Sequence, residues 1–110
     1  MKKAIFVSII AVMLVAALAG FAPAKQDDFV IGIMTGTVSQ GEEEFRAAQN
    51  AAAKYPGKII TATYPDNFSS EVETTVARTL ELASNGADLI VFVQSVPGTA
   101  AAIDKVHEIY

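Results

Sequence analysis

The stretch from Phe29 to Gly41 constrains the fold of this chain more than any other part of it. It opens with an apolar run rich in β-branched residues, passes through a loop of Gly, Thr and Ser, and ends where acidic residues begin a helical segment. A strand, a polar loop and a helix start therefore follow one another directly. In open α/β sheets, loops after strand carboxyl ends line the ligand crevice. We interpret this loop as one wall of a small-molecule site.

The same order of segments recurs twice more along the chain. Alternation of apolar runs with amphipathic segments predicts a parallel sheet with crossover helices. The predicted fold class is α/β, a Rossmann-like three-layer parallel sheet with the order β-α-β-α-β-α. The first run suits a strand buried on both faces, the second alternates and favours an edge, and the third is again continuous. The strands are predicted at 29–34, 58–64 and 88–94, and the helices at about 40–55, 71–83 and 99–110.

Local patterns define the predicted helices further. Ser39–Glu42 and Ser70–Glu73 have the spacing of a capping box, in which a hydroxyl and a carboxylate satisfy free backbone N–H groups. Gly32 lacks a side chain, which predicts close helix packing against the first strand. The predicted apolar helix stripes are Phe45, Ala48, Ala52 and Tyr55 in the first helix, Val72, Val76, Leu80 and Ala83 in the second, and Ile103, Val106 and Tyr110 in the third.

The first 24 residues have the three-part pattern of a secretory signal peptide. A positive start is followed by an apolar run from Ala4 to Ala19 and by small residues up to Ala24, where we place the cleavage. The alternative is an uncleaved membrane anchor, but a spanning helix needs about 20 apolar residues and this run is shorter. Residues 25–28 would form a short linker and 29–110 the domain. We expect a periplasmic, extracellular or envelope location.

Charge and cysteine content exclude several functions. The net charge is −4, and loss of Lys2 and Lys3 with the signal peptide would make it −6. No basic stretch is available to neutralise phosphates, which argues against nucleic-acid partners. The chain has no cysteine, so it has no disulfide, thiolate nucleophile or Cys-ligated metal.

Three polar loops should meet at the carboxyl edge of the predicted sheet. Their hydroxyls and amides offer neutral hydrogen bonds, and two aromatic rings offer flat apolar surface, which suits a small polar ligand. Each loop alone also has the composition of an ordinary turn. The candidate ligand-binding residues are Thr35, Thr37, Ser39, Gln40, Tyr64, Asp66, Asn67, Phe68, Gln94 and Ser95.

Phosphate and metal chemistry are disfavoured by the same loops. Gly36 and Gly41 have the spacing of a phosphate loop, but Glu42 and Glu43 stand where Lys and Ser or Thr are required. Two carboxylates there would repel a polyphosphate. We interpret Glu42–Glu44 as a solvated first helical turn, where the helix dipole favours negative charge, and expect neither a metal nor a cofactor.

Hydrolytic chemistry has weak support. Ser95 follows a predicted strand, but the glycines of a nucleophile elbow are missing around it. His107 lies well along the third helix, away from the loops, and is interpreted as a surface or half-buried residue. Asp66 is the one carboxylate of the predicted site loops, so a ligand contact or a turn is the favoured role. We expect no catalytic residue and no enzyme.

Three segments resemble the type I periplasmic-binding-protein superfamily, and within it an uncharacterised family of exported bacterial lipoproteins, a domain of unknown function. They are Ile31–Phe45, Tyr64–Phe68 with Glu71–Thr75, and Gln94–Ile103. The resemblance implies a two-lobed protein that clamps its ligand between lobes and often serves a transporter or a sensor. Phe21 stands where the lipid-bearing Cys is expected, so no lipid anchor can form there.

The favoured function is therefore an exported solute-binding protein. Three parallel strands make a sparse sheet and the last helix has no stop signal, so we expect a truncated N-terminal lobe. The alternatives are an exported α/β enzyme, such as a hydrolase using Asp66 or Ser95, and a ligand-sensing module that contacts a membrane partner.

The export hypothesis predicts the N-terminus of the mature protein. Because cleavage is placed after Ala24, protein recovered from the cell envelope or medium should begin at Lys25. N-terminal sequencing checks this. A mature chain that still begins at Met1 would contradict the signal-peptide interpretation.

Overall fold

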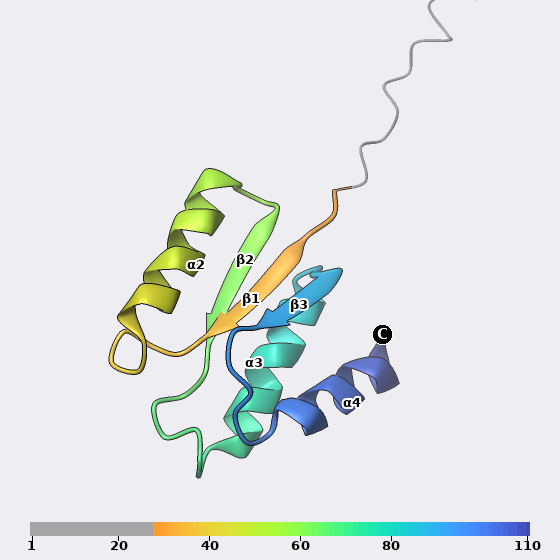
Figure 1. Ribbon diagram of the computed structural model, residues 1–110. Helices are drawn as coiled ribbons and strands as arrows, with labels where there is room; N and C mark the ends of the chain where they lie inside the picture. Colours follow the sequence, from red (N-terminus) through yellow and green to blue (C-terminus); the bar gives the residue numbers. More distant parts are fainter. Residues whose placement is uncertain (1–27) are drawn as a thin grey trace, which may run out of the picture.

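The computed structural model of the chain describes residues 28–110. The predicted signal peptide and all but the last residue of the predicted linker lie outside the described residues. Three strands and three helices alternate within it (Figure 1). Their bounds are β1 Ile31–Thr35, α2 Glu42–Lys54, β2 Ile59–Thr63, α3 Val72–Ser84, β3 Leu89–Phe92 and α4 Thr99–Ile109.

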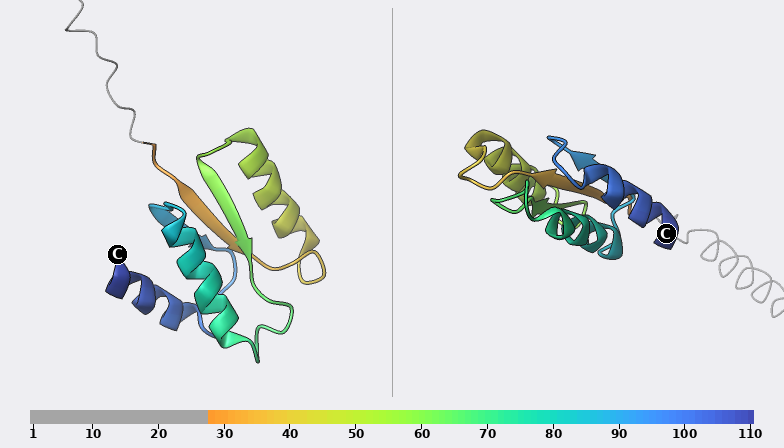
Figure 2. Two further views of the ribbon diagram at one scale, coloured as in Figure 1. Left: turned by 180° about the vertical axis from the view of Figure 1, so that it is seen from behind. Right: turned by 90° about the horizontal axis from the view of Figure 1, so that it is seen from below.

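The strands form one parallel sheet in the order β2-β1-β3. Ile31 of β1 lies opposite Ile59 of β2 and Leu89 of β3, and the register continues along β1. Helix α2 lies on one side of the sheet and helices α3 and α4 lie on the other (Figure 2). The α/β class with a parallel sheet is thereby confirmed. The second predicted strand is an edge strand, as its alternating pattern indicated.

Gly32 brings α3 onto the middle of the sheet. A Cβ atom at Gly32 would lie 3.2 Å from the Cβ of Ala87 and 3.3 Å from a methyl of Leu82. The close packing predicted from this glycine is confirmed. It also identifies the α3 face of β1 as the one that carries Gly32 and Met34, so Ile31 and Ile33 point toward α2.

The core lies between the sheet and α3. Met34, Tyr64 and Leu82 are buried at its centre. Burial of such large side chains is the main stabilising term available to a domain of this size. The half-buried residues packed around them are Ile60, Ala62, Phe68, Ala87, Ile90, Phe92 and Val96.

Both predicted capping boxes are wrong. Helix α2 begins after Gly41 and α3 after Glu71, and neither start has a side-chain cap. The hydroxyl of Ser39 instead donates to Asp66, 3.0 Å away, and that of Ser70 donates to the carbonyl of Asn67. The two serines bond within and between loops, which the local capping pattern could not reveal.

The face that α3 buries also differs from the prediction. Thr75, Thr79 and Leu82 are its buried residues, whereas the predicted stripe through Val76 and Leu80 is only half-buried. The reason is that α3 packs against two partners, the sheet and α4, so its covered face is wider and rotated. The hydroxyl of Thr79 donates to the carbonyl of Thr75, 2.9 Å away, which satisfies it inside the core.

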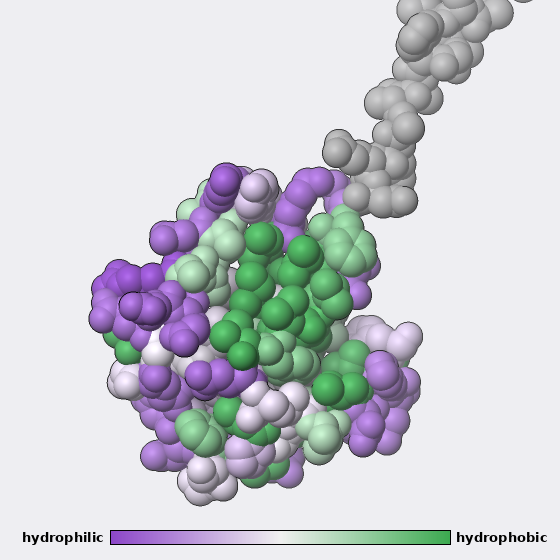
Figure 3. Space-filling view, viewed as in Figure 1, coloured by the Kyte–Doolittle hydropathy of each residue, from purple (hydrophilic) through white to green (hydrophobic). Residues whose placement is uncertain are grey.

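Within residues 28–110, no helix covers one face of β3. Leu89, Val91 and Val93 point to the α2 side and are 48%, 41% and 43% exposed. Figure 3 shows the resulting hydrophobic patch in green, to the right of α2 in this view. The strand order also puts β3 at an edge of the sheet in the described residues, so the third predicted strand is less covered than its continuous apolar run indicated.

The Gly32 contact predicts a specific cost of adding a side chain. Gly32→Ala should lower the free energy of unfolding by about 1–3 kcal/mol, because the new methyl forces Ala87 and Leu82 to shift. Chemical denaturation measures it. Ala87→Gly in the same chain should recover part of the loss, and strictly additive effects in this double-mutant cycle would contradict the contact.

Candidate functional site

The three loops that follow the strands meet at one edge of the sheet, at residues 36–41, 64–71 and 93–98 (Figure 1). The central position of β1 makes this edge a switch point, because the chain leaves β1 toward α2 and leaves β3 toward the opposite face, where α4 lies. Ligand crevices of open α/β sheets form outside such switch points. The fold thus puts the predicted loops in one region.

Asp66 is the centre of a hydrogen-bonded cluster between the first two loops. The hydroxyls of Thr37 and Ser39 both donate to its Oδ1 atom. These bonds, that of Thr37 first and that of Ser39 second, lower the pKa of the Asp66 carboxyl below its usual value of 3.8. Asp66 is therefore ionised at neutral pH. Within residues 28–110, no hydrogen bond engages its second oxygen, Oδ2.

Gln40 joins the same two loops through the backbone. Its side-chain oxygen accepts from the N–H of Thr37 at 3.0 Å, and its Nε2 donates to the carbonyls of Pro65 and Asp66 at 3.1 and 3.0 Å. Gly36 makes room for this side chain, since a Cβ there would lie 2.9 Å from two Gln40 atoms. Gln40 therefore holds the loop that carries Thr37 and Ser39 against the loop that carries Asp66.

Tyr64 connects the second loop to the third. Its ring is 1% exposed, and its hydroxyl donates to the carbonyl of Gln94. Burial raises the pKa of Tyr64 to about 12. Thr35 is buried beside it in β1, with its hydroxyl on the carbonyl of Gly36 at 2.9 Å. The buried side chains of Thr35 and Tyr64 therefore hold the loops through hydrogen bonds to the carbonyls of Gly36 and Gln94.

The remaining predicted residues lie further apart. Asn67 is exposed and its carbonyl accepts from the N–H of Ser70 at 2.9 Å, while Phe68 packs half-buried against the core. Gln94 and Ser95 are exposed on the third loop. The structure thus unites Thr37, Ser39, Gln40 and Asp66 by direct hydrogen bonds, and links Gln94 to them only through Tyr64.

Metal binding has no built site in this part of the chain. Residues 28–110 contain no group of three His, Asp or Glu side chains placed to hold an ion. Glu42 forms an exposed ion pair with Arg46 at 2.6 Å on the first turn of α2.

Among residues 28–110, no helix is both long and apolar enough to cross a membrane.

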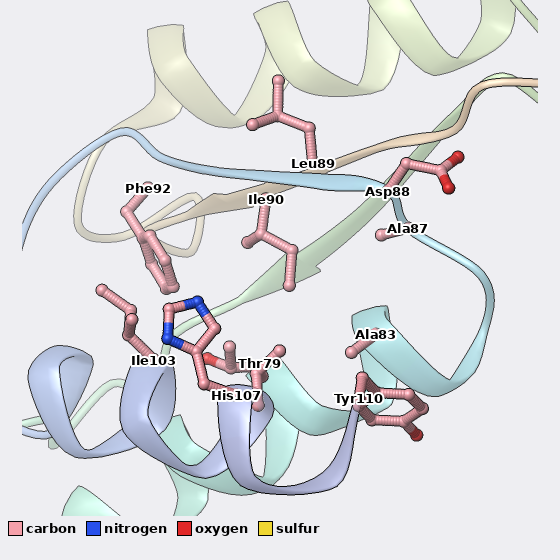
Figure 4. Close-up of a pocket in the computed structure, with 11 residues that line it drawn as sticks. Thr79, Ala83, Ala87, Asp88, Leu89, Ile90, Phe92, Ile103, His107 and Tyr110 are labelled. Carbon is pink, nitrogen blue, oxygen red and sulfur yellow. The ribbon is translucent and has the colours of Figure 1, made fainter.

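A groove between β3 and α4 was missed by sequence reasoning. It has a volume of about 500 Å³ and lies away from the loop cluster. Figure 4 shows the imidazole of His107 turned into it, near Phe92 and Ile103. The predicted apolar stripe of the third helix, Ile103, Val106 and Tyr110, lines this groove, and α4 does not pack on the sheet. The strand β3 and the helix α4 on either side of the groove were both predicted from the sequence. The distance between them depends on tertiary packing, which the sequence pattern does not show.

The fold and its loops define a small α/β domain with a parallel sheet and a polar carboxyl edge. Residues 29–110 match the family described as "Protein of unknown function (DUF3798)", and the chain belongs to that family. An "Uncharacterized protein" of Treponema pallidum (strain Nichols) is 35% identical over an alignment of 91 residues, and the match covers 74% of this chain. The chain spans about 40% of the length of that relative. No solved structure matches this chain.

Burial of Tyr64 predicts a loss of stability in alkali. The unfolded chain releases the phenolic proton near the ordinary pKa of 10.0 and the folded chain near 12, so unfolding becomes more favourable as pH rises between these values. The loss approaches about 3 kcal/mol, at about 1.4 kcal/mol for each unit of pKa difference. Chemical denaturation across the alkaline range measures it.

Two tyrosine variants serve as controls for this prediction. Tyr64→Phe should remove most of the alkaline loss, and at neutral pH it should cost about 1 kcal/mol for the missing hydrogen bond. Tyr110→Phe changes an exposed ring and should leave the pH dependence as it is. An equal alkaline loss in Tyr64→Phe and the unmodified chain would contradict the role assigned to Tyr64.

Proposed function

We propose that this chain supplies one wall of the binding site of an exported solute-binding protein, and that its ligand is a small polar molecule. The observation that carries the proposal is the ionised carboxylate of Asp66, which lies at the carboxyl edge of the sheet and bonds to the loop after β1. Thr37 and Ser39 fix one of its oxygens and leave Oδ2 for another donor. An exposed carboxylate held in this way is poised to accept a hydrogen bond from a ligand.

The cluster also restricts what the ligand can be. The hydroxyls of Thr37 and Ser39 and the amide of Gln40 are committed to loop contacts, so they position Asp66 rather than offer donors. A ligand at Oδ2 must bring its own donors, as hydroxyl or amine groups do. Gln94 and Ser95, exposed on the third loop, would provide the further polar contacts.

We further propose a relationship to the type I periplasmic binding proteins. The parallel three-layer arrangement and the polar loops at the switch point support it. In such a protein a second lobe would provide the opposite wall, and the chain spans about 40% of its Treponema pallidum relative. Export is part of the same proposal and rests on the signal-peptide pattern of residues 1–24. Delivery of the ligand to a transporter and its detection by a sensor both fit this site.

Hydrolysis has less support. A hydrolase would need a base near Ser95 or a second acidic group near Asp66. His107 lies eight positions beyond the start of α4, about 12 Å along the helix axis from the loop edge. Its imidazole turns into the groove between β3 and α4 (Figure 4). Asp66 therefore fits a binding role better than a catalytic one.

Ligand binding is tested by substitutions at the two exposed polar positions. With any ligand found by thermal shift in a panel of polyols, sugars and amino acids, Asp66→Ala should weaken binding about 10- to 100-fold through loss of a charged hydrogen bond. Gln94→Ala should weaken it about 2- to 10-fold through loss of a neutral one. Isothermal titration calorimetry measures both.

The controls separate binding from folding and from catalysis. Asp104→Ala removes an exposed carboxylate on α4, away from the loops, and should leave affinity unchanged. Unchanged affinity in both Asp66→Ala and Gln94→Ala would refute the site. Conversion of the ligand to product that Asp66→Ala abolishes would favour the enzyme alternative over solute binding.

A further inference from the structure

In the part of the chain that the structure describes, the outer edge of β3 presents backbone hydrogen-bonding groups that no neighbouring strand pairs with. The N–H groups of Leu89 and Val93 donate to the carbonyls of Val30 and Met34, at 3.3 and 3.0 Å, so this set of residues faces β1. In a strand the alternate residues face the other way. Ile90 and Phe92 therefore direct their N–H and C=O groups to the open side of the sheet, where an added strand could pair.

Apolar side chains flank this edge on both faces. Leu89, Val91 and Val93 are exposed on the α2 side, and Ile90 and Phe92 border the groove on the α3 side. An edge strand that is apolar on both faces suits a partner strand that is covered on both faces. The other edge strand, β2, is covered by a helix on each face, because α2 and α3 both pack against it.

Helix α4 lies where it would cover a strand added beside β3. It packs against α3, not against the sheet, and extends beyond β3 (Figures 1 and 2). Its residues Ile103, Val106 and Tyr110 face the groove of about 500 Å³. A strand paired with β3 would turn alternate side chains into this groove and onto α4, and the remaining side chains would extend the patch of Leu89, Val91 and Val93.

A second copy of the chain does not fit this edge. Two-fold pairing of β3 with β3 would bring the α4 helices of both copies beneath the two paired strands. Paired strands are about 4.8 Å apart, whereas packed helices need about 8–10 Å between their axes. The helices would overlap, so the surface suits one strand without a helix of its own at that position.

We propose that the β3 edge and the groove behind it receive one extended strand that is apolar on both faces. The source we assign is the part of the longer family proteins that has no match in these 110 residues. The Treponema pallidum relative carries such polypeptide, because this chain spans about 40% of its length. The ligand site around Asp66 lies at the loop edge, so the two proposals fail or succeed separately.

Co-production with a tagged partner tests the proposal. The 110-residue chain is produced together with the unmatched part of the Treponema pallidum relative. We expect a complex of one chain with one partner. Amide exchange by NMR should slow at least tenfold at Ile90 and Phe92, whose N–H groups face the free edge, and change little at Leu89, which is already bonded to β1.

Matched lysine substitutions locate the interface. Val91→Lys at the edge and Ile103→Lys in the groove should each weaken capture at least tenfold. Val38→Lys changes a valine of comparable exposure, 48% against 41% for Val91, on the loop after β1 and should leave capture intact. All three positions are exposed, so thermal unfolding of each variant alone should stay close to that of the unmodified chain.

Three results would overturn the proposal. One is the absence of a complex with the unmatched part of the relative. Another is a complex that Val38→Lys weakens as much as Val91→Lys does. The third is a stable dimer of the chain alone in which the amides of Ile90 and Phe92 are protected, since a second copy would then occupy the edge.

Discussion

Parallel pairing of β1 with both of its neighbours is the constraint on which the rest of this structure depends. It sends the carboxyl ends of all three strands to one edge, and with them the polar loops. It also requires a crossover between strands, here a helix. The crossovers from β1 to β2 and from β2 to β3 run in opposite directions across the sheet, so right-handed connections put α2 and α3 on opposite faces. Gly32 allows α3 to approach β1 closely, and Met34, Tyr64 and Leu82 form the core between them. The position of Asp66 follows from these contacts.

The candidate site illustrates how polar loops use their hydrogen bonds. Thr37, Ser39 and Gln40 were selected from the sequence as ligand contacts, but in the structure they bond to Asp66 and its backbone neighbours. Such bonds order the loops, which reduces the entropy lost when a ligand binds. The groups left for a ligand are fewer than the sequence suggested, namely Oδ2 of Asp66 and the exposed side chains of the third loop.

The elements and their parallel arrangement could be predicted because each rests on a local pattern, namely apolar runs that alternate with amphipathic segments. The errors arose where partners distant in the sequence decide the outcome. Ser39 bonds to Asp66, 27 residues away, and so does not cap α2. The buried face of α3 depends on α4, and the groove exists because α4 stands away from β3. Hydrophobic periodicity alone carries no information about these contacts.

The two proposed surfaces share one structural element. Helix α4 follows the loop that carries Gln94 and Ser95, and its later turns line the groove beside β3. Gly98, with φ of 94°, connects that loop to α4 and packs against Val72 of α3. A strand bound in the groove would contact α4 and β3 at once, and so would hold both ends of the loop between them. Occupation of the groove would then order the third loop of the ligand site, although Asp66 itself does not line the groove.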